Sequence, residues 1–289
     1  MIEILAEMFS YTFLVRAFFV GLLVSLCASL LGVSLVLKRY SMIGDGLSHV
    51  GFGSLAVATA ANLAPLAVSI PVVVAAAFLL LRLSENSRIN GDAAIAMIST
   101  GALAAGVVII SRTTGMNTDV CNYLFGSILA MTKNDVYLSI SLSVLVLLLF
   151  FFFYNIIFSI TFDETFVRSC GVNTGLNNMI IAFLTAVTIV LGMRMMGALL
   201  ISSLIIFPAL TSMRLCKRFK TVTVCGAAVS LVCYFTGLVI SYLYAVPTGA
   251  SVVILNIFTF ILFCAIDFLI KFIAGRRFRR AETARGAPQ

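Results

Sequence analysis

Runs of about 20 apolar residues, separated by short polar breaks, fill most of this chain and restrict it to one class of fold. A helix needs about 20 mostly apolar residues to cross the roughly 30 Å hydrocarbon layer of a membrane. Of the 289 residues, 62% are hydrophobic and only 10% are charged, which is not the composition of a water-soluble domain. The sequence therefore predicts an all-α, polytopic transmembrane helical bundle.

Nine of the apolar runs are candidate membrane spans, and an eight-span arrangement stays open. We expect them to form a single transmembrane domain over residues 1–289, since no connecting segment is long enough for a separate soluble domain. The stretch 120–131 is an alternative candidate for a re-entrant or surface helix. The predicted spans are 12–37, 44–62, 65–83, 92–111, 136–158, 178–192, 197–215, 221–244 and 250–272.

The basic residues predict which side of the membrane each connection faces, because Lys and Arg gather in cytoplasmic loops. This bias is satisfied with the N-terminus outside and the C-terminus in the cytoplasm. The cytoplasmic side then receives Lys38, Arg39, Arg82, Arg88, Arg168, Arg214, Lys217, Arg218, Lys220 and a basic tail over 272–289. The net charge of +8 is thus explained by topology, and no nucleic-acid partner is expected.

His49 is the only histidine in the chain, and it follows Asp45 by four residues. If this stretch is helical, both side chains project from one face and can reach a common ligand. Imidazole and carboxylate together suit zinc, manganese or ferrous iron. A helix-capping aspartate beside a hydrogen-bonded core histidine is the plainer alternative. Ionisable groups inside a span cost about 2.5–3.5 kcal/mol each, which favours the metal-ligand interpretation.

The polar segment from Thr161 to Gly171 has the signals of a short helix. Asp163 and Glu164 suit a helix N-terminus, and Gly171 suits the position just after a C-terminus. A helix on the cytoplasmic face would be a natural docking element for a partner, although a plain loop helix explains the pattern equally well.

Two glycines and a proline interrupt the apolar sequence near its centre. Gly192 and Gly197 flank the stretch Met-Arg-Met-Met, and Pro208 lies inside the following run. This pattern predicts a short, broken or kinked pair of helices, which membrane proteins tolerate where backbone lines a cavity or is buried in protein.

The motifs of ATP-using and hydrolytic enzymes are missing from the chain. There is no G-x-x-x-x-G-K-[ST] phosphate loop, no H-E-x-x-H and no G-x-S-x-G. The seven cysteines form no C-x-x-C pair and are interpreted as small apolar residues. The spans also carry few ionisable groups for ion-coupled transport. A translocation pathway driven by another protein fits these absences, and a non-transporting membrane scaffold is a rival hypothesis.

The segment from Lys38 to His49, KRYSMIGDGLSH, resembles the signature of the metal-type ABC importer permeases, a family that imports zinc, manganese or iron. The resemblance extends over most of the chain through 91–96, 123–129, 192–211 and 247–250. After the histidine the family often has a small residue, a proline and a glycine, where this chain reads Val50-Gly51-Phe52-Gly53.

This resemblance implies a type II ABC importer-like permease in a bacterial inner membrane, which is not itself an enzyme and holds no cofactor. Its partners would be a second permease copy, two cytoplasmic ATPase subunits that hold the ATP, and an extracytoplasmic metal-binding protein. Asp45 and His49 would bind the transported metal, with zinc preferred. Manganese, iron or a metal-independent cobalamin- or siderophore-like role are the alternatives. A coupling helix at about 162–172 would present Asp163, Glu164, Thr165, Arg168 and Gly171 to the ATPase.

Overall fold

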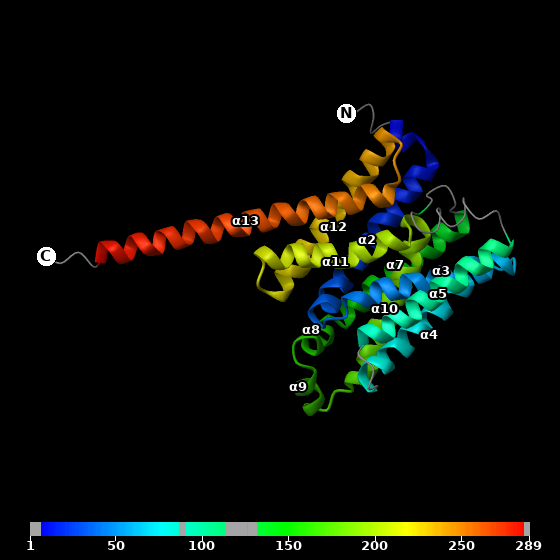
Figure 1. The fold of residues 1–289 in the computed structure, drawn as a ribbon, viewed down its shortest axis with the longest axis horizontal. Coiled ribbons are helices and arrows are strands. Elements are labelled where there is room, and N and C mark those ends of the chain that lie inside the picture. The colour runs from blue at the N-terminus through cyan, green and yellow to red at the C-terminus, as the bar shows by residue number, and fades with distance from the viewer. Residues whose placement is uncertain (1–6, 87–90, 114–125, 127–131, 286–289) are drawn as a thin grey trace.

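The computed structural model describes residues 7–86, 91–113, 126 and 132–285, and all regular structure in these ranges is helical. This confirms the predicted all-α fold (Figure 1). The stretch 120–131 lies outside the described residues except for Gly126. The helices are α2 (Thr12–Leu37), α3 (Ser41–Ala60), α4 (Pro65–Asn86), α5 (Gly91–Thr113), α7 (Lys133–Phe152), α8 (Tyr154–Phe162), α9 (Glu164–Ser169), α10 (Thr174–Met196), α11 (Ala198–Leu215), α12 (Phe219–Tyr244) and α13 (Thr248–Arg285).

Nine long helices in the described part of the chain correspond to the nine predicted spans. Seven of them are long and apolar enough to cross a membrane, and the remaining two are α3 and α11. Glycines, serines, Asp45 and His49 make α3 more polar than its neighbours, and α11 is the shortest of the nine. The count of seven to nine spans therefore depends on two helices that contact each other.

The prediction of one helix over 136–158 was wrong, because the helix is interrupted at Phe153. Helix α7 ends there and the nine-residue α8 begins immediately afterwards. The run Phe150–Phe153 consists of aromatic residues, which have only modest helix propensity. The break directs α8 toward the end of the bundle where α9 lies (Figure 1).

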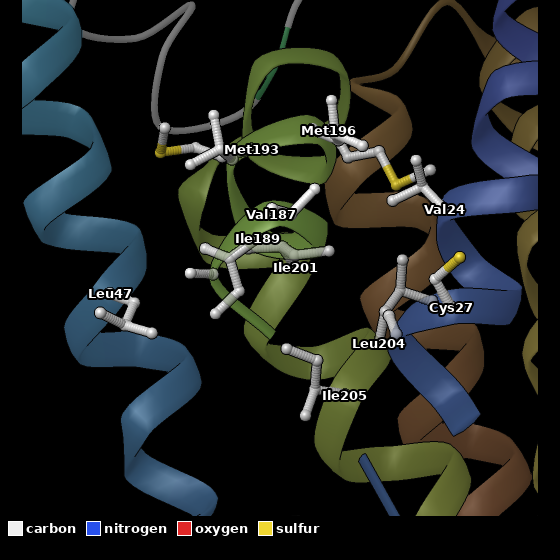
Figure 2. Packing of buried hydrophobic residues seen from close by; sticks show 14 of the residues in the cluster. Val24, Cys27, Leu47, Val187, Ile189, Met193, Met196, Ile201, Leu204 and Ile205 are labelled. Atoms are coloured by element: carbon white, nitrogen blue, oxygen red, sulfur yellow. The ribbon is translucent and has the colours of Figure 1, made fainter. Parts of the chain in front are cut away.

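Helices α2 and α10 form the centre of the bundle. In the apolar 18-residue stretch of each, 72% of the residues are buried inside the protein, against 6% for α13. Side chains from α2, α3, α10 and α11 meet in one apolar cluster, shown in Figure 2. In lipid the hydrophobic effect gives little net drive for helices to associate, so close packing must hold such a bundle together. The labelled members include Val24, Leu47, Ile189, Ile201 and Leu204.

Small residues allow the central helices to approach backbone to backbone. A Cβ atom added at Gly32 of α2 would lie 2.0 Å from the carbonyl oxygen of Ile205 in α11. Helix α12 closes against the other side of α2, where the buried Tyr234 hydroxyl donates a hydrogen bond of 2.8 Å to the Ala17 carbonyl. The position of α2 is thus fixed by direct contacts with both neighbours.

Two tight turns set the positions of the helices that carry the candidate site. Between α2 and α3, Arg39 adopts φ 62°, and the Tyr40 amide donates to the Leu35 carbonyl at 2.8 Å. This is the hydrogen-bonding pattern of a helix ended by a left-handed residue. Between α10 and α11 the only intervening residue is Gly197, with φ 90°. The predicted broken helix pair is therefore present.

Candidate functional site

Asp45 and His49 lie one turn apart on α3 and face each other. The Nε2 atom of His49 is 3.6 Å from Oδ2 of Asp45. Two ligands bound at about 2.1 Å to a tetrahedral zinc ion would be about 3.4 Å apart. The two side chains are therefore spaced much as two ligands of one such ion would be.

A third oxygen comes from α11. The hydroxyl of Ser202 lies 3.3 Å from Oδ1 of Asp45 and 3.3 Å from the Ala198 carbonyl of its own helix, so its one proton can be donated to either acceptor. This contact joins two residues 157 positions apart in the sequence. The Ser202 hydroxyl is thus beside one carboxylate oxygen of Asp45, while the other faces His49.

The pair lies in an accessible but sheltered place. The Asp45 side chain is 37% exposed and the His49 side chain 15% exposed. The Nδ1 atom of His49 is buried without a hydrogen-bond partner among the described residues, so only Nε2 is directed to Asp45. A neutral imidazole that binds a metal through Nε2 carries its proton on Nδ1. Nε2 is therefore the nitrogen that shares a position with the Asp45 carboxylate, and a proton on Nδ1 would have no acceptor among the described residues.

Glycines on three sides of α3 allow the neighbouring helices to come close to the pair. A Cβ at Gly46 would be 2.6 Å from Cγ2 of Ile95 in α5, and one at Gly51 would be 2.6 Å from Cε of Met193 in α10. On the α11 side, a Cβ at Gly44 would be 3.3 Å from Ile205. In contrast, Gly101 of α5 faces open space. The glycines of α3 thus serve close packing, as expected for small residues at helix contacts.

Helix α9 lies within the predicted segment and has the capping residues that the sequence indicated. The amide of Phe166 donates to the Asp163 carboxylate at 2.8 Å, which caps the N-terminus. Gly171 follows the last turn with φ 83°, and its amide donates to the Arg168 carbonyl at 3.1 Å. Asp163 and Gly171 therefore determine where this short helix begins and ends.

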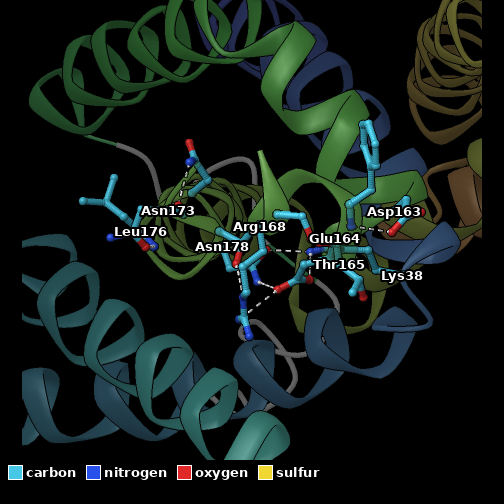
Figure 3. Close-up of polar contacts among 12 residues, drawn as sticks. Lys38, Asp163, Glu164, Thr165, Arg168, Asn173, Leu176 and Asn178 are labelled. Carbon is cyan, nitrogen blue, oxygen red and sulfur yellow. Dashed lines mark hydrogen bonds and ion pairs between the residues drawn. The ribbon is translucent and has the colours of Figure 1, made fainter. Parts of the chain in front are cut away.

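The carboxylate of Glu164 points into the bundle, as Figure 3 shows. Its Oε2 lies 3.1 Å from Nζ of Lys38, and its Oε1 accepts a hydrogen bond of 3.0 Å from the Asn178 amide. Lys38 also donates to Oδ1 of the Asn178 side chain at 2.6 Å. We call these three residues the polar triad. Each residue contacts the other two, so the triad joins the end of α2, the start of α9 and the second turn of α10.

The outer side of α9 is open. Thr165 is exposed, Phe166 is 65% exposed, and the side chain of Arg168 is 70% exposed while its Nε donates to the Thr174 hydroxyl at 3.2 Å. A groove of about 430 Å³ between α8 and α9 is lined in part by Phe162 and Phe166. Exposed aromatic side chains beside a groove are typical of a surface that binds another protein.

The sequence interpretation overlooked three polar residues that complete these sites. Ser202 is one of several serines in an apolar run, and Lys38 was assigned to a cytoplasmic connection and to the start of the family-like segment, not to a contact with Glu164. Asn178 was taken as the first residue of a span. No local pattern links these residues to Asp45 or Glu164, because the contacts join distant parts of the chain. No cluster of three or more His, Cys, Asp or Glu side chains occurs in the part of the chain that the structure describes.

The comparisons with known proteins agree with this architecture. The model of the ABC 3 transport family matches residues 10–267. The high-affinity zinc uptake system membrane protein ZnuB of Haemophilus influenzae is 30% identical over 87% of this chain and 97% of that protein. The manganese transport system membrane protein MntC of Halalkalibacterium halodurans is 25% identical over 86% of this chain and 85% of that protein.

A solved structure has the same fold over nearly the whole length. PsaBC from Streptococcus pneumoniae in complex with Fab matches with a TM-score of 0.82 and 26% identity, over 91% of this chain and 95% of that chain. The family match covers far more than half of the sequence and includes the helices that carry Asp45, His49 and the polar triad. The chain therefore belongs to the ABC 3 transport family of metal-type ABC permeases.

Proposed function

We propose that this chain is the membrane permease subunit of an ATP-driven importer for a divalent transition metal, with zinc as the preferred cargo. The observation that carries the proposal is the Asp45–His49 pair on α3, with its 3.6 Å separation and the Ser202 hydroxyl behind it. Ionisable side chains inside a membrane protein mark ion pathways, proton relays or ligand contacts, and a carboxylate that faces an imidazole suits a divalent transition metal.

The incomplete ligand set suits transport. A structural zinc site has four protein ligands and is closed, whereas Asp45 and His49 supply two. Water or the same pair of a second protomer would complete the coordination. An ion held this weakly can enter and also leave, which a transport pathway requires.

Manganese is the second candidate, because the chemistry of Asp45 and His49 suits it nearly as well. The relatives named for zinc and for manganese support both cargoes. The imidazole favours zinc, while additional oxygen ligands such as the Ser202 hydroxyl would favour manganese. A cobalamin- or siderophore-like permease is the less favoured alternative, because it gives the facing pair no task.

Energy and metal must come from partners. We propose two copies of the chain, two cytoplasmic ATPase subunits and an extracytoplasmic metal-binding protein, in a bacterial inner membrane. Helix α9 and the basic residues lie on the cytoplasmic side in this arrangement, with the N-terminus outside. The open face of α9, with Thr165, Phe166 and Arg168, is the surface proposed to contact the ATPase.

Metal uptake into proteoliposomes that contain the complete transporter tests the cargo and the ligands together. Asp45→Asn and His49→Ala should each abolish uptake of radioactive zinc while the ATPase still assembles with the permease. Ser203→Ala is a matched control, because the Ser203 hydroxyl bonds to the Leu200 carbonyl of its own helix. Normal zinc uptake by both ligand variants would rule out Asp45 and His49 as the metal ligands. Uptake of manganese but not of zinc by the unchanged protein would make manganese the preferred cargo.

Crosslinking tests the ATPase contact separately. A cysteine at Thr165, in a variant where the exposed Cys170 is replaced by serine, should crosslink to the ATPase subunit. A cysteine at Tyr137, which is 74% exposed at the other end of the bundle on α7, should not. Labelling of the Thr165 position by an impermeant reagent added outside intact cells would contradict the proposed orientation.

A further inference from the structure

A groove of about 470 Å³ lies between α2, the α7–α8 junction and α12, away from the Asp45–His49 pair. Its apolar walls include Leu26 and Leu30 of α2, Phe150 of α7 and Ala227 of α12. Phe151 and Val224 stand at its edges and are 64% and 63% exposed. The groove is therefore apolar and open along the side of the bundle, where lipid chains would surround a membrane protein.

One end of the groove is polar and positively charged. Lys220, in the first turn of α12, and the Asn155 side chain, at the start of α8, both line it. Lys220 is the only charged residue in α8 and α12, and it has no ion-pair partner among the described residues. Lys220 is exposed, so its ammonium group is free to meet an anion at the mouth of the groove.

The polar end is at the α9 side of the bundle. The ring of Phe219, next to Lys220, lies 5.1 Å from the ring of Phe158 and 6.0 Å from that of Phe162, both in α8. From Lys220 to Ala227 the groove follows α12 for about 10 Å at 1.5 Å per residue. Its length thus runs from this end of the bundle toward the membrane interior.

We propose that this groove binds one anionic phospholipid from the leaflet that borders α8 and α9. The phosphate would accept hydrogen bonds from Lys220 and Asn155, and one acyl chain would lie against Leu26, Leu30 and Ala227. Basic pockets between transmembrane helices bind anionic headgroups in this way. Because α8 forms one wall and leads directly into α9, the bound lipid would also support the segment proposed to contact the ATPase.

The chain contains no tryptophan, so one introduced indole reports on this groove alone. Phe151→Trp places it at the groove edge, and Phe268→Trp on α13, where Phe268 is 69% exposed, is the matched control. The full-length protein is placed in phosphatidylcholine nanodiscs with increasing fractions of brominated phosphatidylglycerol, which quenches nearby indoles.

Quenching of the Phe151→Trp protein should reach half its maximum at a lower mole fraction of phosphatidylglycerol than quenching of the control. Adding Lys220→Gln should raise that fraction about five-fold, which corresponds to the loss of one lysine near the membrane surface, and Lys220→Arg should leave it unchanged. Equal quenching at both positions, or no effect of Lys220→Gln, would overturn the proposal. The groove indole could also be protected both from brominated phosphatidylglycerol and from brominated phosphatidylcholine. That result would overturn the proposal and would assign the groove to a second protein chain.

Discussion

The polar triad makes an asymmetric prediction about stability, because its two charged members differ in burial. The side chain of Lys38 is 8% exposed and that of Glu164 is 33% exposed. Glu164→Gln leaves a nearly buried cation without its counterion, whereas Lys38→Met leaves a carboxylate that water can still reach. Glu164→Gln is therefore the more damaging change, although the glutamine retains most of the shape of the side chain.

The size of each effect follows from these exposures. Removing one partner of a fully buried ion pair costs about 3–5 kcal/mol, and exposed pairs contribute about 0.2–1 kcal/mol. Glu164→Gln should lie between these limits, at about 2 kcal/mol of unfolding free energy. Lys38→Met should cost about 1 kcal/mol, the typical value of a lost hydrogen bond. The double variant should cost less than the sum, since neither charge is then left alone.

Reversible unfolding of the permease in mixed micelles with increasing SDS measures these free energies. Lys271→Gln is the control, because it breaks an ion pair of 2.7 Å with Asp267 in which the lysine is 75% exposed, so its effect should be small. Equal costs for Lys38→Met and Glu164→Gln, or strict additivity in the double variant, would refute the reasoning from burial.

Three further changes test the packing and the capping. Gly32→Ala should destabilise the protein by about 1–3 kcal/mol, because the added methyl group clashes with the α11 backbone. Gly101→Ala should not destabilise it, because Gly101 faces open space. Thermal unfolding followed with a thiol-reactive dye compares the two variants. Tyr234→Phe should cost about 1 kcal/mol in the same assay, because it removes the hydrogen bond to the Ala17 carbonyl. Asp163→Ala should remove the cap of α9 at a cost of about 1 kcal/mol and speed proteolysis between α8 and α10, and unchanged cleavage there would contradict the capping role.

The ends of α10 show what a hydropathy pattern can and cannot predict. The apolar run predicted a span over 178–192, but the helix extends over Thr174–Met196. Asn178, the first residue of the predicted span, and Arg194, just beyond its end, are costly in a membrane unless they have partners. Their partners remove that cost: Asn178 belongs to the polar triad, and Arg194 is paired with Asp135 at 3.3 Å. Contacts between distant residues of this kind are not visible in one sequence.

The two candidate sites differ in the same way. The spacing of Asp45 and His49 identifies a shared helix face, so this pair could be predicted from sequence alone. Asp163 and Gly171 were also predictable, since capping residues act on adjacent backbone. The inward orientation of Glu164 was not, because the position of Lys38 next to it depends on how α2 packs against α10 and on how α10 contacts α9. Local chemistry was thus predictable, and its connections to distant helices were not.

X-ray absorption at the zinc edge tests the central claim most directly, because His49 is the only imidazole in the chain. The zinc-loaded permease, purified without a polyhistidine tag, should show imidazole scattering with nitrogen and oxygen neighbours at about 2.0–2.2 Å. One imidazole per zinc is expected if water completes the site, or two if two protomers share the ion, and this signal should be lost in His49→Ala. Bound zinc with no imidazole scattering, or an unchanged spectrum in His49→Ala, would contradict this claim.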